Sequence, residues 1–271
     1  KRRRRGTLRQ RHQRLDHRLA RHTHRDRHAP HLAHAPTRDF FFLLGEDSTM
    51  QTPKFVLLDF DGVVIEGTNE GYFHCYHRAL GEVGVSLDAQ AERQSIIQYW
   101  GTGHVKQLEM LLRDHQEKVD AAARAWETCV ESPTFWDHAL LIDGSKEAIA
   151  QMCRHVPVAI VSGARKRHIE RIVERDGLVG IGAIYSSYDV EPLLRKPHPH
   201  LLQQALKQFD IAPTEAIYVG DMNNDVRMAR AAGVEPVVVL TGVMSREDAR
   251  QESVVLIADN LLAVAKQFYP L

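Results

Sequence analysis

The chain after residue 50 alternates short apolar runs with helical patterns, and this alternation constrains its fold more than any other feature. Five continuous apolar runs occur at residues 55–58, 158–161, 183–185, 216–219 and 236–240, and a further one at 254–257. Such runs are typical of strands that are buried on both faces. Helical patterns separate them at residues 146–154, 167–175, 200–209 and 225–232, the last closed by Gly233. The sequence therefore predicts an α/β fold, a doubly wound, Rossmann-like parallel sheet with helices on both faces.

One long interval after the first apolar run is different. Between Asp61 and about residue 143 we expect no strand, and the patterns are helical at residues 72–83, 89–99, 105–115 and 119–130. We interpret residues 69–143 as an all-helical cap inserted into an α/β core of residues 50–68 and 144–271. Ligands of open α/β sheets bind at the carboxyl ends of the strands, so an insertion at this point is expected to cover the site.

Composition and cysteine content exclude several classes of protein. With 44% hydrophobic and 26% charged residues, the chain has the composition of a soluble globular protein. No apolar run approaches the roughly 18–20 residues that span a bilayer, so we expect no membrane partner. The three cysteines, Cys75, Cys129 and Cys153, are odd in number and form no Cys-x-x-Cys pair. They predict free thiols in a reducing, cytoplasmic compartment.

The formal net charge of zero hides two oppositely charged parts. Residues 1–49 hold 13 Lys and Arg against five acids, together with seven histidines, whereas the remaining 222 residues hold 22 basic and 30 acidic groups. The basic segment has almost no apolar periodicity before Phe40, which predicts disorder. Nucleic-acid binding, metal binding through its histidines and organelle targeting are three roles open to it. Because Met50 directly precedes the first predicted strand region, we prefer the interpretation that residues 1–49 are translated upstream sequence or a tail without a function.

Acidic side chains follow two of the predicted strands at the point where each strand ends. Asp59 and Asp61 come after the first run, and Asp221 and Asp225 come after the run at 216–219. Because parallel strands end at the same edge of a sheet, we expect these carboxylates to converge. Converging carboxylates repel one another unless a cation neutralises them, and hard oxygen ligands suit Mg²⁺ and phosphate substrates.

Two further residues at the same edge are suited to phosphate binding. Ser162, followed by Gly163, closes the run at 158–161, and Lys196, followed by Pro197, lies in the loop after the third run. A hydroxyl and an ammonium group are hydrogen-bond donors to phosphoryl oxygens. Each signal is weak alone, but the ordered set at successive strand ends predicts a site that binds phosphate.

These residues resemble the four sequence motifs of the haloacid dehalogenase-like hydrolase superfamily. The matching segments are Asp59-Phe60-Asp61-Gly62-Val63, Ser162, Lys196-Pro197 and Gly220-Asp221-x-x-x-Asp225. The resemblance extends over residues 55 to about 262. The helical insertion between the first and second motifs is similar to that of members with a C1 cap, such as phosphoglycolate phosphatases and β-phosphoglucomutase.

The resemblance implies a role for each aspartate of the first motif. Asp59 would be the nucleophile that attacks phosphorus and forms an aspartyl-phosphate. Asp61 would protonate the leaving alcohol and then deprotonate the hydrolytic water. An acid at position 61 also argues against a haloacid dehalogenase, which lacks one there.

The resemblance also implies how a metal ion and the phosphoryl group are held. Mg²⁺ would be bound by Asp59, the main-chain carbonyl of Asp61, and Asp221. Asp225 would be either a further ligand or an anchor for the others. The residues that would bind the transferring phosphoryl group and offset its charge are Ser162, Gly163 and Lys196.

We therefore predict a Mg²⁺-dependent phosphomonoesterase of the phosphoglycolate-phosphatase type, acting on a small phosphorylated metabolite. A β-phosphoglucomutase-like sugar phosphomutase is the alternative, although the mutases tend to have two adjacent acids where this chain has Gly220-Asp221. The Ser162-Gly163 pair departs from the Thr-Asn pair frequent in those phosphatases, which leaves the substrate open. A nucleic-acid-binding protein acting through residues 1–49 is a different class, and the intact set of motif residues argues against it.

One turn in the predicted cap is a candidate for substrate recognition. Gly101-Thr102-Gly103-His104 separates two helical patterns, and such a loop can face the active site. His104, Lys106 or Arg113 would then contact the part of the substrate that does not react, with Gly103 in the turn itself. The simpler interpretation is that each of them is a solvated helix or loop residue.

Overall fold

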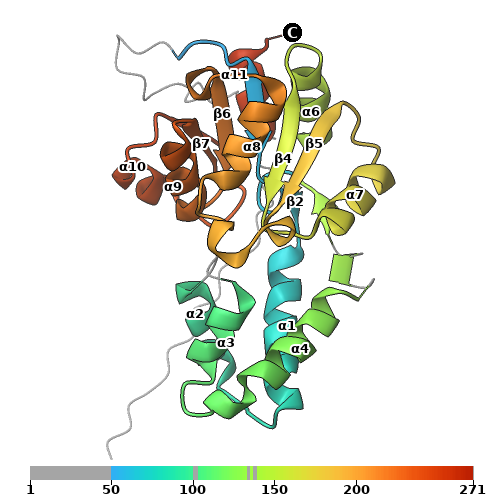
Figure 1. Ribbon diagram of the computed structural model, residues 1–271, viewed down its shortest axis with the longest axis vertical. Helices are drawn as coiled ribbons and strands as arrows, with labels where there is room; N and C mark the ends of the chain where they lie inside the picture. Colours follow the sequence, from blue (N-terminus) through green and yellow to red (C-terminus); the bar gives the residue numbers. More distant parts are fainter. Residues whose placement is uncertain (1–49, 100–102, 133–134, 137–138, 271) are drawn as a thin grey trace, which may run out of the picture. The chain divides into compact units, whose positions relative to one another are not determined.

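The computed structural model describes residues 50–99, 103–132, 135–136 and 139–270 (Figure 1). The basic segment at 1–49, with the predictions made for it, lies outside the described residues, as do Gly101 and Thr102 of the predicted turn. Within the described part of the chain, no helix combines the length and the apolar character needed to cross a membrane.

A six-stranded parallel sheet forms the centre of the fold and confirms the predicted α/β class. Its spatial order is β5-β4-β1-β6-β7-β8, and every neighbouring pair is parallel. β1 lies between β4 and β6, where Leu57 pairs with Ala159 on one side and with Tyr218 on the other. The six strands overlap the predicted apolar runs: β1 (Phe55–Leu58), β4 (Val158–Ser162), β5 (Ile181–Ser186), β6 (Ala216–Gly220), β7 (Glu235–Val239) and β8 (Leu256–Ala258).

Helices cover both faces of this sheet. Successive residues of β1 point to opposite faces, so Val56 and Leu58 enter one apolar core whereas Phe55 and Leu57 enter the other. The helices α6 (Ser145–Cys153), α7 (Lys166–Arg175) and α11 (Leu261–Phe268) contribute to the first core, which also extends into the helices inserted after β1. The helices α8 (His200–Phe209) and α9 (Asn223–Ala232) contribute to the second core. The short α10 (Arg246–Gln251) follows β7. This is the doubly wound arrangement that the sequence predicts.

α9 ends at the glycine that the sequence analysis assigned to its C-terminus. Gly233 has a φ of 75°, in the left-handed region, and its backbone N–H donates to the Arg230 carbonyl. A left-handed residue here satisfies carbonyls of the last turn that the helix itself leaves without partners. The prediction of this helix end is confirmed.

Helices occupy most of the described residues between β1 and α6, as predicted for the cap, and Figure 1 shows them gathered together below the sheet. The longer of these helices are α1 (Thr68–Glu82), α2 (Ala89–Gln98), α3 (His104–Leu111) and α4 (Val119–Val130). The expectation of no strand in this interval was wrong. β2 (Ile65–Glu66) and β3 (Leu140–Leu141) form an antiparallel pair, which brings the two ends of the insertion together. Strands of two residues are too short to produce a periodic pattern in the sequence. The boundaries between core and cap at residues 69 and 143 stay predictions.

The prediction of free thiols was wrong for two of the three cysteines. Cys75 in α1 and Cys129 in α4 form a buried disulfide, and Cys153 is free. The pair is 54 residues apart in sequence and meets because α1 packs on α4, a contact that cysteine spacing does not reveal. The prediction of a reducing compartment was based on free thiols, and this disulfide removes that basis.

Candidate active site

The three central strands end in residues that the sequence assigned to a site. Asp59 follows β1, Ser162 is the last residue of β4, and Asp221 follows β6. Because these strands are parallel neighbours, their carboxyl ends meet at one edge of the sheet. Lys196 reaches the same edge from the segment between β5 and α8, and its ammonium group contacts Asp59.

A tight turn after β1 positions Asp59 and Asp61. The fully buried Phe60 stands between them, and its carbonyl accepts the backbone hydrogen bonds that close the turn. Gly62 follows with a φ of +73°, and a Cβ at this position would overlap Oδ2 of Asp221. Position 62 therefore needs glycine both for its left-handed backbone and for the space that Asp221 fills.

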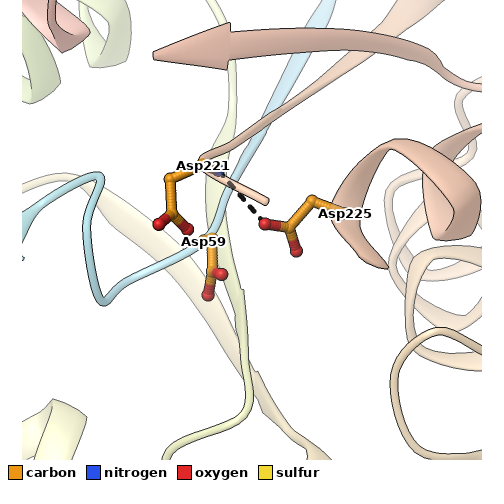
Figure 2. Close-up of side chains that lie close together, drawn as sticks. All are labelled: Asp59, Asp221 and Asp225. Atoms are coloured by element: carbon orange, nitrogen blue, oxygen red, sulfur yellow. Dashed lines mark hydrogen bonds between the residues drawn. The ribbon is translucent and has the colours of Figure 1, made fainter. Parts of the chain in front are cut away.

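Three buried carboxylates converge beside this turn (Figure 2). One oxygen each from Asp59, Asp221 and Asp225 lies within 4.8 Å of the others. Burial raises the pKa of Asp59 to about 7; the Lys196 ammonium opposes this shift and the Asp225 carboxylate adds to it. Burial, and then the charges of Asp225 and Asp59, also raise the pKa of Asp221 well above its ordinary value. The cluster holds mutually repelling charges, which a bound cation would relieve.

Lys196 supplies one cation to this cluster. Its Nζ lies 2.9 Å from Oδ2 of Asp59 and 3.1 Å from Oδ1 of Asp225, and only 11% of its side chain is exposed. Burial by itself lowers the pKa of Lys196, but the carboxylates of Asp225 and Asp59 outweigh burial and hold that pKa above its ordinary value. The ammonium group is therefore charged at neutral pH.

Asp225 is held by hydrogen bonds from its own chain. Its Oδ2 accepts the backbone N–H of Asp221 at 3.1 Å and of Met222 at 3.2 Å, which also caps the start of α9. Its Oδ1 contacts Lys196 and lies 3.2 Å from the Tyr218 hydroxyl, which in turn accepts a hydrogen bond from Lys196. The sequence does not indicate a role for Tyr218, because a tyrosine within an apolar strand carries no signal beyond burial.

Asp221 has the hydrogen-bonding pattern of a metal ligand. Its Oδ2 accepts the backbone N–H of Val243 at 2.9 Å, whereas its buried Oδ1 has no hydrogen-bond partner among the described residues. A Cβ on Gly242 or Gly62 would collide with this carboxylate, so backbone encloses it closely on two sides. A buried carboxylate oxygen without a donor, beside a second buried carboxylate at Asp59, fits a hard cation such as Mg²⁺.

The predicted phosphate-binding residues differ in how they reach the site. Gly163 and Lys196 line the cavity above the carboxylates, whereas Ser162 is fully buried beneath it and is not a lining residue. The Ser162 hydroxyl accepts the backbone N–H of Ala164 at 3.1 Å. It therefore holds the loop that follows β4, and its own proton remains available for donation.

A cavity of about 560 Å³ opens above Asp59 and Asp61. Side chains from α1 and α4 and from the loops after β4 and β5 complete its walls. Its aromatic lining residues are Tyr72, Tyr76, Trp126, Trp136 and Tyr188. None of these aromatic residues is predicted from the sequence to belong to the site, because aromatic residues at helical spacing indicate only packing.

The three predicted cap residues line this same cavity. Gly103 is exposed at the start of α3, and His104 stacks on Trp126 with ring centroids 4.3 Å apart. Burial lowers the pKa of His104, partly offset by Glu127, whose Oε1 lies 3.3 Å from its Nε2. Lys106 is largely exposed and pairs with Glu109 at 2.9 Å.

Arg113, the fourth residue that the sequence suggested for substrate recognition, lies away from the cavity. Arg113 is not a lining residue of the cavity, and its side chain is 80% exposed beside Asp114. For Arg113 the simpler interpretation, a solvated residue, agrees with its position.

The fold and this centre together define an α/β enzyme with buried aspartates at the carboxyl edge of its sheet. The profile of the haloacid dehalogenase-like hydrolase family matches residues 56–239, and the chain belongs to this family. The family indicated by the four motifs and the predicted hydrolase class are confirmed.

Relatives and solved structures agree with this assignment. A phosphoglycolate phosphatase from Nitrosococcus oceani is 24% identical over 221 residues, which cover 79% of this chain and 96% of the relative. A phosphoglycolate phosphatase from Pectobacterium atrosepticum is 27% identical over 192 residues, covering 68% and 79%. A haloacid dehalogenase-like family hydrolase from Streptococcus pneumoniae matches with a TM-score of 0.69 at 19% identity, covering 80% of this chain and 99% of that one. The structural likeness shows the fold, and the relatives' names support a phosphatase.

We expect Asp221→Asn to stabilise the metal-free protein, and the gain to grow with pH. The pKa of Asp221 is raised in the folded state, so the folded state binds its proton more tightly than the unfolded state and loses stability as pH rises. Asn cannot ionise and avoids this loss. Thermal unfolding in EDTA should give a melting temperature at least about 3 °C above wild type near pH 8 and a smaller difference near pH 5.

The two melting temperatures are compared at each pH. The buried histidines titrate in both proteins, so their effect cancels in the difference between the melting temperatures. Asp114→Asn is the matched control, since its side chain is 82% exposed and should change little at either pH. An Asp221→Asn protein less stable than wild type near pH 8 would contradict the assignment of a strained, buried carboxylate.

Proposed function

We propose that this chain is a Mg²⁺-dependent phosphomonoesterase that hydrolyses a small phosphorylated metabolite through an aspartyl-phosphate on Asp59. The observation that carries the proposal is the pairing of the Asp59 carboxylate with the buried Lys196 ammonium at 2.9 Å, on the floor of a cavity shared with Asp61. Lys196 stabilises the ionised form of Asp59 against the opposing effect of burial. It thereby favours the nucleophilic form of this carboxylate.

In the first step, an oxygen of Asp59 attacks phosphorus, and the bond from phosphorus to the ester oxygen of the substrate breaks. The leaving alcohol takes a proton from Asp61. Desolvation of the partly buried Asp61 carboxyl raises its pKa, which helps it to hold the proton it must donate. In the second step Asp61 accepts a proton from water, which attacks the aspartyl-phosphate, releases phosphate and restores Asp59.

The residues that would hold Mg²⁺ are Asp59, Asp221 and the main-chain carbonyl of Asp61. Bound there, Mg²⁺ would neutralise charge on the phosphoryl oxygens and reduce repulsion between the carboxylates. Of the two roles open to Asp225, we propose that of anchor. Its oxygens already accept backbone hydrogen bonds from Asp221 and Met222 and contact Lys196, so they position Asp221 and the ammonium group.

In this proposal, the residues that bind the phosphoryl group are Ser162, Gly163 and Lys196. Lys196 and Gly163 line the cavity, and the Ser162 hydroxyl, which accepts the Ala164 N–H, still has its own proton to donate. Together they would offset charge on the transferring group. Gly103, His104 and Lys106 would contact the leaving group from the cap side of the cavity.

The proposal is tested by phosphate release from a panel that includes p-nitrophenyl phosphate, 2-phosphoglycolate and β-glucose 1-phosphate. We expect removal of divalent metal with EDTA to lower turnover by about 100-fold or more, because a metal ion contributes several kcal/mol of charge stabilisation. Added Mg²⁺ should restore it. Full activity in EDTA would contradict the metal site. Conversion of β-glucose 1-phosphate into glucose 6-phosphate without phosphate release would identify the phosphomutase instead.

A further inference from the structure

The cavity above Asp59 is lined by residues whose buried polar atoms have no hydrogen-bond partner in the described part of the chain. In the described part of the chain, seven buried side-chain atoms lack a hydrogen-bond partner, and all seven belong to residues that line this cavity. They are Asp61 Oδ1, His104 Nε2, Trp126 Nε1, Glu131 Oε1, Ser187 Oγ, Arg195 Nε and Asp221 Oδ1. Buried polar groups in native proteins are normally paired, so such a concentration indicates where a ligand completes the structure.

For four of these atoms, the lack of a hydrogen-bond partner can be explained without a contact to the leaving group of a substrate. Asp61 and Asp221 belong to the proposed catalytic centre. His104 and Glu131 have ionic partners despite imperfect hydrogen-bond geometry: Nε2 of His104 lies 3.3 Å from a carboxylate oxygen of Glu127, and Glu131 pairs with the Arg165 guanidinium. Three atoms remain, on Trp126, Ser187 and Arg195.

These three remaining groups are all hydrogen-bond donors. The indole N–H and the guanidinium can only donate, and a serine hydroxyl can donate or accept. Trp126 is 6% exposed and Ser187 is 5% exposed, so water does not readily replace a partner. Arg195 forms no ion pair with any other residue that the structure describes, and its guanidinium lies 5.0 Å from the centroid of the Tyr188 ring. The cavity therefore offers unpaired donors that require acceptor atoms.

The walls around these donors are flat and largely apolar. Tyr72 stacks on Trp126 with an interplanar angle of 9°, Tyr76 lies against Trp126 at 5.5 Å, and Tyr188 carries two guanidinium groups over its ring. The volume of about 560 Å³ falls in the range of roughly 300–1,000 Å³ typical of pockets for drug-sized ligands. A two-carbon acid phosphate would leave most of these walls without contact, whereas a planar ring matches them.

We propose that the substrate is a phosphate monoester whose leaving alcohol carries a planar heteroaromatic ring with carbonyl acceptors, as in a nucleoside 5′-monophosphate. The inference rests on the proposed phosphatase function of the same site. Asp59 takes the phosphoryl end, the ring packs among Tyr72, Trp126 and Tyr188, and its acceptor atoms pair with the unsatisfied donors. Trp126, Ser187 and Arg195 then determine specificity without taking part in the chemistry.

The first test compares uridine 5′-monophosphate with ribose 5-phosphate, which has the same phosphate and a sugar but no ring system. We expect kcat/KM of the full chain to be at least about tenfold higher for uridine 5′-monophosphate, the size of a typical base–aromatic contact. Equal values, or a preference for 2-phosphoglycolate, would overturn the ring site while leaving the phosphatase intact.

The second test uses two adjacent serines of different kinds. Ser187→Ala removes a hydroxyl without a partner, so the melting temperature should stay unchanged while the preference for uridine 5′-monophosphate falls about fivefold. Ser186→Ala is the structural control: its hydroxyl donates to the Ala164 carbonyl at 2.7 Å and accepts the Tyr188 N–H at 3.0 Å, so the melting temperature should fall. An unchanged preference in Ser187→Ala would count against the assigned donor.

Arg195→Gln should lower the same preference by at least about tenfold, because a hydrogen bond from a charged group is lost. Arg78→Gln is its matched control, since Arg78 pairs with Glu82 on the exposed face of α1 and does not line the cavity. A preference that responds equally to both substitutions would contradict a role for Arg195 in the cavity.

Binding separates this inference from the proposed function. With Asp59→Asn protein, quenching of tryptophan fluorescence reports ligand in the cavity without turnover. Uridine 5′-monophosphate binding at least tenfold tighter than ribose 5-phosphate would support the ring site, even if the wild type hydrolysed none of the panel and the phosphatase proposal failed. Equal affinities would overturn the ring site even in an active phosphatase.

Discussion

Asp59→Asn is expected to lower turnover of p-nitrophenyl phosphate by about 10⁴-fold or more, since it removes the atom that bonds to phosphorus. Asn has nearly the same shape as Asp, and its amide oxygen can still accept the backbone N–H of Phe60, which lies 2.7 Å from Oδ1 in the wild type. The loss should therefore appear in kcat, with ligand binding retained. Single-turnover phosphate release measures the loss in kcat, and a melting curve shows whether the fold is retained.

Stability distinguishes a chemical loss from a structural one. Burial raises the pKa of Asp59 to about 7, so an uncharged amide should not cost the metal-free protein stability near neutral pH. Asp114→Asn, an exposed aspartate on the cap, should keep full turnover. An Asp59→Asn protein that folds normally and retains more than about a hundredth of wild-type turnover would refute covalent catalysis at this residue.

The sequence predicted the parts of the site that depend on strand ends. Asp59 and Asp221 directly follow apolar runs long enough to be recognised as strands, and Lys196 lies in the loop that follows a third run. Parallel topology then requires the ends of neighbouring strands to meet. The structure brings these side chains together at the edge formed by β4, β1 and β6. Their convergence follows from local patterns and one general rule about α/β sheets.

The parts that were missed depend on packing between segments that are distant in the chain. Trp126, Ser187 and Arg195 come from α4 and from the segments after β5, and sequence periodicity does not show that all three line one cavity. The disulfide between Cys75 and Cys129 was missed for the same reason. Helical spacing indicates which face is buried but not which other helix buries it.

Burial also explains why the residues of the centre are costly to keep in the fold. Desolvation, and charge repulsion between Asp221 and Asp225, raise the pKa of Asp221, and Oδ1 of Asp221 has no donor among the described residues. A protein selected for stability alone would place apolar or amide side chains here. The retained repulsion supports the proposal that a cation and a phosphoryl group complete the centre.

Asp61→Asn should separate the two chemical steps that the proposed mechanism assigns to this residue. With an alkyl phosphate, turnover should fall by about 10²–10⁴-fold, the usual contribution of general acid–base catalysis, because an amide neither donates nor takes up a proton at neutral pH. With p-nitrophenyl phosphate the leaving group needs little protonation, so the first step should be partly spared. Hydrolysis of the aspartyl-phosphate still needs the base, and product should appear as a burst of about one equivalent per site followed by slow turnover.

A structural role for Asp61 predicts the opposite pattern. Its Oδ1 has no hydrogen-bond partner among the described residues, and an amide oxygen could still accept the hydrogen bond that the carboxylate receives from Thr68. Asn should therefore fit at position 61 without loss of melting temperature. If Asp61 only shaped the turn before Gly62, the Asn protein would turn over both substrates at nearly the wild-type rate and show no burst. The two roles predict different rates and a different dependence on the substrate. Rapid-mixing kinetics on the two phosphates therefore decides between them. Near-normal turnover of the alkyl phosphate would refute the proton-transfer role.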